Sequence, residues 1–128
     1  MGTLDTMRAY ADAWLAGDWD RATGYWADGI VHHVPGHGPL SGDFQGKDAF
    51  LDTYRERLGE LGGTIEVVAV HDILASDDHA AMLVTERAIR GERSLAFNRV
   101  VIYHLRDDRI VETWSYDYDP PALDAFWS

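Results

Sequence analysis

Four long strand-like runs fill the second half of the chain, between residues 64 and 118. They read TIEVVAVHDIL, HAAMLVTERAIR, SLAFNRVVIYHL and RIVETWSYDY, and the turn stretches ASDD, GER and RDD separate them. Strands joined by turns this short predict an antiparallel meander. Runs of about ten residues exceed the usual strand length, and long, strongly twisted strands curl.

The first half of the chain has helical patterns instead. Apolar residues recur on one helical face over residues 3–16, 19–26 and 47–61, and glycines follow the first and third of these segments. A short strand is expected from Ile30 to Pro35, followed by a loop rich in Pro and Gly up to residue 43. Segregated helices and strands predict an α+β fold of one domain, residues 1–128. We expect a cone-shaped, strongly curved, mainly antiparallel sheet wrapped around the N-terminal helices.

Charge and composition narrow the possible partners. The chain has 11 Lys and Arg against 22 Asp and Glu, a formal charge of -11, which opposes binding to nucleic acid or to anionic membranes. There is no cysteine, which suits a reducing cytoplasm, and the first residues lack the apolar run of a signal peptide or membrane helix. We therefore expect a cytoplasmic protein with neither nucleic acid nor membrane as partner.

Two adjacent histidines in IVHHVPGHGPLSG, residues 30–42, are the most conspicuous candidates for chemistry. Neighbouring strand residues point to opposite faces, so His32 and His33 cannot both enter one cavity. We expect His33 to be the one inside, either as a neutral base near pKa 6.5 or as a core histidine satisfied by hydrogen bonds. No HExxH motif and no cysteine occur, so we expect no metal and no cofactor in the pocket.

Three stretches resemble one superfamily over nearly the whole chain. They are AWLAGDWDRATGYWADGIVHHVPG, FQGKDAF and the closing HLRDDRIVETWSYDYD. The chain resembles the nuclear transport factor 2-like superfamily, in the branch of SnoaL-like polyketide cyclases and ketosteroid isomerase-like proteins. The resemblance implies the cone-shaped fold, which hosts isomerases, cyclases, epoxide hydrolases, dehydratases and non-enzymatic binding domains.

The resemblance also suggests roles at single positions. His33 stands where ketosteroid isomerases have their general base, an Asp, and Tyr10 stands at their oxyanion tyrosine. Val101 replaces their second oxyanion donor. Limonene-type epoxide hydrolases share the run VTER and use an Arg between two aspartates. Arg87 matches that Arg, and the two aspartates are absent, with Ile89 and Ser115 at their positions.

Strand alternation gives a further expectation for the charged residues. We expect Arg87 and Arg99 on the concave side and Glu86 and Glu112 on the outside. Asp117 would then either pair with one of these arginines or act as a general base.

Together these points predict an apolar pocket that takes a hydrophobic, polyketide- or steroid-like carbonyl compound. The expected activity is an acid–base isomerase or cyclase, with His33, Tyr10 and Asp117 as catalytic residues. The expected substrate contacts are Trp14, Tyr54, Arg87, Arg99, Tyr103 and Ser115. The alternatives are a non-catalytic domain that binds a small molecule or a partner, and an epoxide hydrolase or dehydratase with an altered relay. A homodimer through the outer sheet face is also expected.

Overall fold

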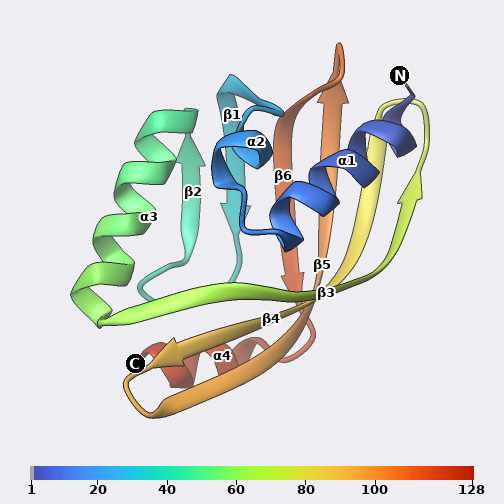
Figure 1. The fold of residues 1–128 in the computed structure, drawn as a ribbon. Coiled ribbons are helices and arrows are strands. Elements are labelled where there is room, and N and C mark those ends of the chain that lie inside the picture. Colours follow the sequence, from blue (N-terminus) through green and yellow to red (C-terminus); the bar gives the residue numbers. More distant parts are fainter. Residues whose placement is uncertain (1) are drawn as a thin grey trace.

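A computed structural model describes residues 2–128, as helices packed on one mixed sheet (Figure 1). The helices are α1 (Thr3–Leu15), α2 (Trp19–Thr23), α3 (Lys47–Leu61) and α4 (Pro120–Trp127). The strands are β1 (Trp26–Val34), β2 (Gly42–Gln45), β3 (Gly63–Ala75), β4 (His79–Arg90), β5 (Arg93–Arg106) and β6 (Arg109–Asp117). The α+β class and the meander of β3 to β6 are confirmed.

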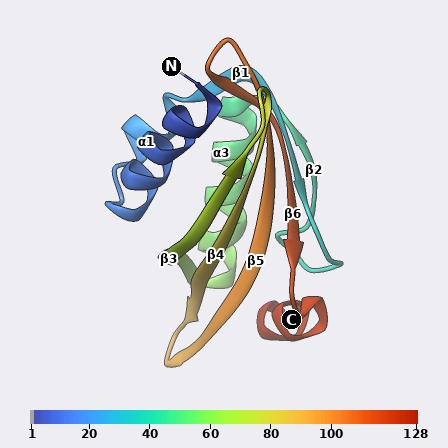
Figure 2. The ribbon, with the colours of Figure 1, turned by 90° about the vertical axis from the view of Figure 1, so that its right-hand side faces the viewer.

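The six strands form an open sheet in the order β2-β1-β6-β5-β4-β3. Strand β1 runs parallel to β6, and the other neighbouring pairs are antiparallel. The pairing of β3 with β4 shifts register twice, between Val67 and Ala69 and between Val70 and Asp72. Such irregularities bend a strand, and Figure 2 shows the long strands curving past α1 and α3, with α4 beyond the end of β6. The expected curved sheet around the helices is confirmed.

Two tight turns fix the register of the meander. Arg90 pairs with Arg93 across one two-residue turn, and Arg106 pairs with Arg109 across the other. The second turn holds Asp107 and Asp108 at positive φ, 53° and 60°. Positive φ at both central positions matches the twist of the flanking strands.

Some elements differ from the sequence-based expectation. Strand β1 begins at Trp26 rather than Ile30, α2 ends at Thr23, and both β2 and α4 were not predicted. Strand β2 is only four residues long and gains its structure by pairing with β1. Helix α4 does have a local signal, because Asp119 accepts a capping hydrogen bond from the Ala122 amide at 3.3 Å, with Pro120 in the first turn.

The buried residues form two groups. The larger one joins α1 to the concave face of β4, β5 and β6 and includes Met7, Tyr10, Met82 and Tyr103. The smaller one packs α4 against α3 and the ends of β3 and β5. In β4 the buried positions alternate, so that even-numbered residues face the helices and odd-numbered residues face away. Within residues 2–128, no helix is long and apolar enough to cross a membrane.

Candidate functional site

A cavity of about 370 Å³ opens between the concave face of the sheet and helices α1, α2 and α3. Its walls are mainly aromatic and aliphatic. The lining residues that carry polar side-chain groups are Tyr10, Thr23, His32, Tyr54, Arg55, Thr64, Glu86, Arg99, Tyr103, Thr113 and Ser115. A largely apolar pocket with a few converging polar groups is the usual form of a small-molecule site.

Strand β1 directs His32, not His33, into this cavity. His33 lies on the outer face, where its Nδ1 is 2.7 Å from Asp43 Oδ1 and its Nε2 is 2.6 Å from Glu112 Oε2. Its ring stacks on Trp114. The hydrogen bonds to Glu112 and Asp43 raise the pKa of His33 above its usual value. The prediction that His33 faces the cavity is therefore wrong, because the strand has the opposite phase.

His32 is held in the cavity wall by one polar contact and two aromatic rings. Its Nδ1 lies 2.7 Å from the Thr113 hydroxyl, and its ring packs against Trp26 and Phe50. Burial lowers its pKa to about 4, and nearby His33 acts in the same direction, so the imidazole is neutral at ordinary pH. Within residues 2–128 its buried Nε2 has no hydrogen-bond partner. That nitrogen is available to a ligand.

An arginine between two carboxylates forms the charged part of the site. Arg99 Nε donates to Asp117 Oδ1 at 2.7 Å, and Arg99 Nη1 lies 3.3 Å from Glu86 Oε2. The side chains are almost fully buried, with exposed fractions of 10% for Arg99, 6% for Glu86 and 3% for Asp117. The contact to Glu86 is an ion pair and not an aligned hydrogen bond, since Glu86 Oε2 has no hydrogen-bond partner in the described chain.

The two carboxylates of this group differ in their contacts. Asp117 has the short, charge-assisted bond to Arg99 and does not line the cavity, whereas Glu86 does. Burial raises the pKa of Glu86, Arg99 lowers it, and Asp117 raises it, with a net upward shift. Burial alone would lower the pKa of Arg99, and the two carboxylates more than offset this, so the guanidinium stays charged. Glu86 is thus a cavity carboxyl suited to exchanging a proton.

Three tyrosines supply hydroxyl donors around Glu86. Burial raises the pKa of Tyr10 to about 12 and of Tyr54 to about 12, and raises that of Tyr103 well above its usual value. Their hydroxyls therefore keep their protons. The Trp26 indole N–H donates to the Tyr10 hydroxyl at 3.3 Å, and the hydroxyls of Tyr10 and Tyr103 also form a hydrogen bond with each other.

The cavity brings together most of the predicted site residues. Tyr10, Trp14, Tyr54, Arg99, Tyr103 and Ser115 line it as expected. Arg87 does not, because it points to the outer face and pairs with Glu66 at 3.2 Å. Asp117 does not line the cavity, and it accepts a hydrogen bond from Arg99, which does line it. The expected outward direction is confirmed for Glu112 and wrong for Glu86.

His32 and Glu86 are among the cavity residues that the sequence analysis missed. A signal for Glu86 exists in the two-residue turn at Gly91 and Glu92. An antiparallel hairpin closed by that turn places Val84 opposite Arg99, so Glu86 shares the face of Arg99 and Arg87 cannot.

A family model for the SnoaL-like domain matches residues 7–113. The chain belongs to the SnoaL-like domain family. Solved structures with the same fold include proteins described as nuclear transport factor 2-like and as cystatin-like. The resemblance deduced from the sequence motifs is confirmed at this level.

Individual relatives show how far the similarity extends. Uncharacterized protein Rv0034 of Mycobacterium tuberculosis is 27% identical over 126 residues, which cover 98% of this chain and 95% of that protein. Bal32a, from a soil-derived mobile gene cassette, is 27% identical with a TM-score of 0.84, covering 98% of this chain and 96% of its own. TerC co-crystallized with polyporic acid has a TM-score of 0.82 at 12% identity and covers 98% and 97%. At that identity TerC shares the fold alone.

Proposed function

We propose that this SnoaL-like chain is an acid–base isomerase or cyclase that acts next to a carbonyl group of a small, largely apolar molecule. The observation that carries the proposal is Glu86, a carboxyl with a raised pKa in the wall of an apolar cavity. A general base of this kind works best when its pKa approaches the operating pH. The site needs no cofactor for this chemistry.

The neighbouring groups suit the charges that develop in such a reaction. Glu86 takes a proton from the carbon next to the carbonyl, and the electron pair of the broken C–H bond moves to the carbonyl oxygen. Tyr10 or Tyr103 donates a hydrogen bond to this enolate oxygen. Return of the proton to another carbon completes an isomerisation. In a cyclisation the enolate carbon attacks a second carbonyl carbon, the π electrons of that carbonyl move to its oxygen, and this oxygen takes the proton from Glu86. Arg99, fixed by Asp117, orients Glu86.

The cavity also indicates what kind of molecule is bound. Aromatic walls from Trp14, Trp26 and Phe50 favour a flat, apolar body, and His32 Nε2 offers a single polar contact at another point of the wall. TerC, with polyporic acid in its crystals, shows the same fold in the presence of a small organic molecule. The proposal includes a cytoplasmic location, consistent with the lack of cysteine.

Hydrogen–deuterium exchange tests the proposed proton abstraction. The purified protein is incubated in D₂O with apolar ketones such as 2-tetralone, and NMR follows the loss of the protons next to the carbonyl. We expect wild type to accelerate exchange and Glu86→Gln to slow it by roughly a hundredfold or more. Arg87→Gln is the matched control, since the adjacent side chain points outward, and it should exchange like wild type.

Two results would contradict the proposal. One is exchange by Glu86→Gln at the wild-type rate. The other is binding of these ketones, seen by quenching of the cavity tryptophans, with no exchange above the buffer rate. That second result would favour a non-catalytic binding domain.

One observation favours epoxide hydrolysis as a second candidate. Arg99 lies between two carboxylates, an arrangement similar to the Arg and aspartate relay of limonene-type epoxide hydrolases, though at other positions. In that reaction a water activated by Glu86 would attack an epoxide carbon while Tyr10 protonates the leaving oxygen. Incubation with limonene oxide in H₂¹⁸O would then give a diol labelled with one ¹⁸O, and Glu86→Gln would not form it.

A further inference from the structure

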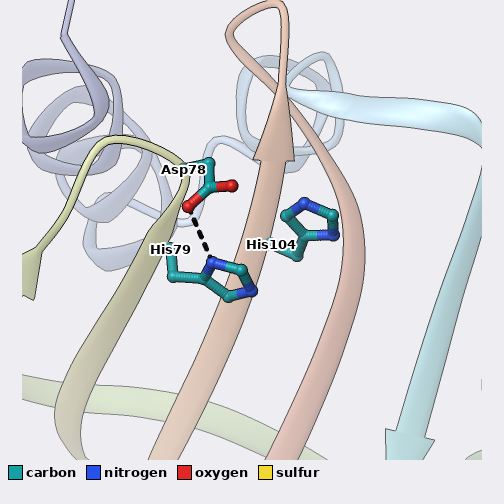
Figure 3. A group of neighbouring side chains, drawn as sticks. All are labelled: Asp78, His79 and His104. Carbon is teal, nitrogen blue, oxygen red and sulfur yellow. Dashed lines mark hydrogen bonds and ion pairs between the residues drawn. The ribbon is translucent and has the colours of Figure 1, made fainter.

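Three side chains with metal-binding atoms gather on the outer face of the sheet, at the end of β4 and β5 near the β3–β4 turn. They are Asp78, His79 and His104, and one ligand atom from each lies within 4.8 Å of the other two (Figure 3). His79 and His104 point away from the cavity, since their neighbours Ala80 and Tyr103 are on the inner face, and Asp78 in the adjoining turn does not line the cavity. The group is thus separate from the site of Glu86.

The backbone holds these residues in place. His79 and His104 are direct partners in the β4–β5 register. The Leu105 amide donates to the Asp78 carbonyl at 2.8 Å, which ties the β3–β4 turn to β5 beside His104. Ser76 closes the turn, because its amide donates to the His79 carbonyl at 2.8 Å and its hydroxyl accepts from the His79 amide at 3.2 Å. These hydrogen bonds order the backbone around the three residues before any ligand binds.

The side chains have donor atoms free for a ligand. His79 Nδ1 lies 2.9 Å from Asp78 Oδ1, which leaves His79 Nε2 and the second Asp78 oxygen available. The rings of His79 and His104 are stacked with centroids 4.5 Å apart, and no hydrogen bond from the described residues reaches a His104 nitrogen.

We propose that Asp78, His79 and His104 bind a divalent transition-metal cation of the Zn²⁺ class. Imidazole nitrogen and carboxylate oxygen are ligands that Zn²⁺ prefers, with bonds of about 2.0–2.2 Å. Ligand atoms in such a shell lie about 3.4 Å apart, so closure by rotation of the half-exposed His79 and Asp78 side chains is enough. The charge of -11 raises the local concentration of cations. Water fills the remaining coordination position.

The bound ion would act as a clamp on one end of the sheet. His104 follows Tyr103, which lines the cavity, and His79 precedes Ala80, the register partner of Tyr103. An ion that joins His79 to His104 therefore fixes the pair of strands that carries Tyr103. Binding to the folded chain alone also raises its stability.

Calorimetric titration with ZnCl₂ tests the proposal on chelator-treated, full-length protein. We expect saturable binding of one Zn²⁺ per chain and a rise in melting temperature with added Zn²⁺. His79→Gln and His104→Gln should each weaken binding by roughly tenfold or more. His71→Gln is the matched control, because His71 is an exposed strand histidine bonded to Thr85 and outside the group, and it should bind like wild type.

Two other outcomes would overturn the proposal of a metal site. Wild type that shows no saturable binding removes the site. Equal affinity in His79→Gln and wild type, with loss in His33→Gln, would place the ion at the His33, Asp43 and Glu112 group instead. Circular dichroism of each variant confirms that it is folded, so that a loss of binding reports on the ligands.

Discussion

Adjacent residues of this chain have opposite environments, and Glu86 and Arg87 show it most clearly. The Glu86 side chain is 6% exposed and lines the cavity, whereas that of Arg87 is 44% exposed and pairs with Glu66 on the outer face. A shift of the strand by one residue would exchange the two. The chemistry of the pocket therefore depends on strand phase as much as on which residues the sequence contains.

The raised pKa of Glu86 predicts a specific dependence of stability on pH. The folded state favours the protonated carboxyl, so its stabilising contribution is fully present below the unfolded value of 4.5 and is lost as pH rises through the folded pKa. Urea unfolding of wild type and Glu86→Gln between pH 4.5 and 8.5 measures it. Stability of wild type relative to the variant should fall with rising pH.

A constant difference between wild type and Glu86→Gln over the whole pH range would show that the pKa of Glu86 is not raised.

At the scale of elements, local sequence signals were enough for the long helices and strands. Helix α3 matches its expected bounds, and β4 also does. Strand β1 shows a property that such local signals do not predict, namely which face of the strand points inward. Its residues Ile30, Val31 and Val34 are apolar on both sides of the histidine pair, so alternation alone cannot decide its phase. Tertiary packing decides it, as Ile30 is fully buried and His32 lies on the same side.

Helix α3 provides a test of element-level stability at two glycines. Gly62 ends the helix with a φ of 64°, whereas Gly59 is an exposed residue within the helix. A methyl group added at either position would have no atom of the described chain within 4 Å beyond the adjoining backbone. Gly62→Ala should lower the free energy of unfolding by about 1 kcal/mol, since only the backbone strain of an L-residue acts there. Gly59→Ala should raise it by up to about 1 kcal/mol. Chemical denaturation that gave both variants the same sign would contradict this account of the helix end.

For the whole molecule, the outer face of the sheet leaves aromatic side chains uncovered. Tyr116 is 57% exposed and Tyr118 is 62% exposed, and Trp114 lies beside them on β6. We propose that a second copy covers this face, because exposed apolar patches of this kind mark interfaces. Light scattering at micromolar concentration should give twice the chain mass of 14.4 kDa. A mass of one chain would contradict it, and Tyr116→Lys should shift a dimer toward monomer.

The cavity itself follows from the family fold, and most of its lining was predictable once that fold was recognised. Tyr10 and Trp14 on α1 and Tyr54 on α3 lie where the helical pattern places them. The charged residues were harder, because both faces of β4 and β5 carry apolar side chains. Leu83 and Ile102, for example, are on the outer face. Only the pairing register separates the two faces of these strands.

The strand phase is the central claim, and an NMR titration of the histidine side chains measures it in one sample. Signals of His32 and His33 are assigned with the variants His32→Gln and His33→Gln and followed from pH 3.5 to 9. The cavity residue His32 should titrate near pKa 4, and His33, held by Glu112 and Asp43, should titrate above 6.5. The reverse order, with His33 depressed and His32 raised, would place His33 in the cavity and contradict the site described for this chain.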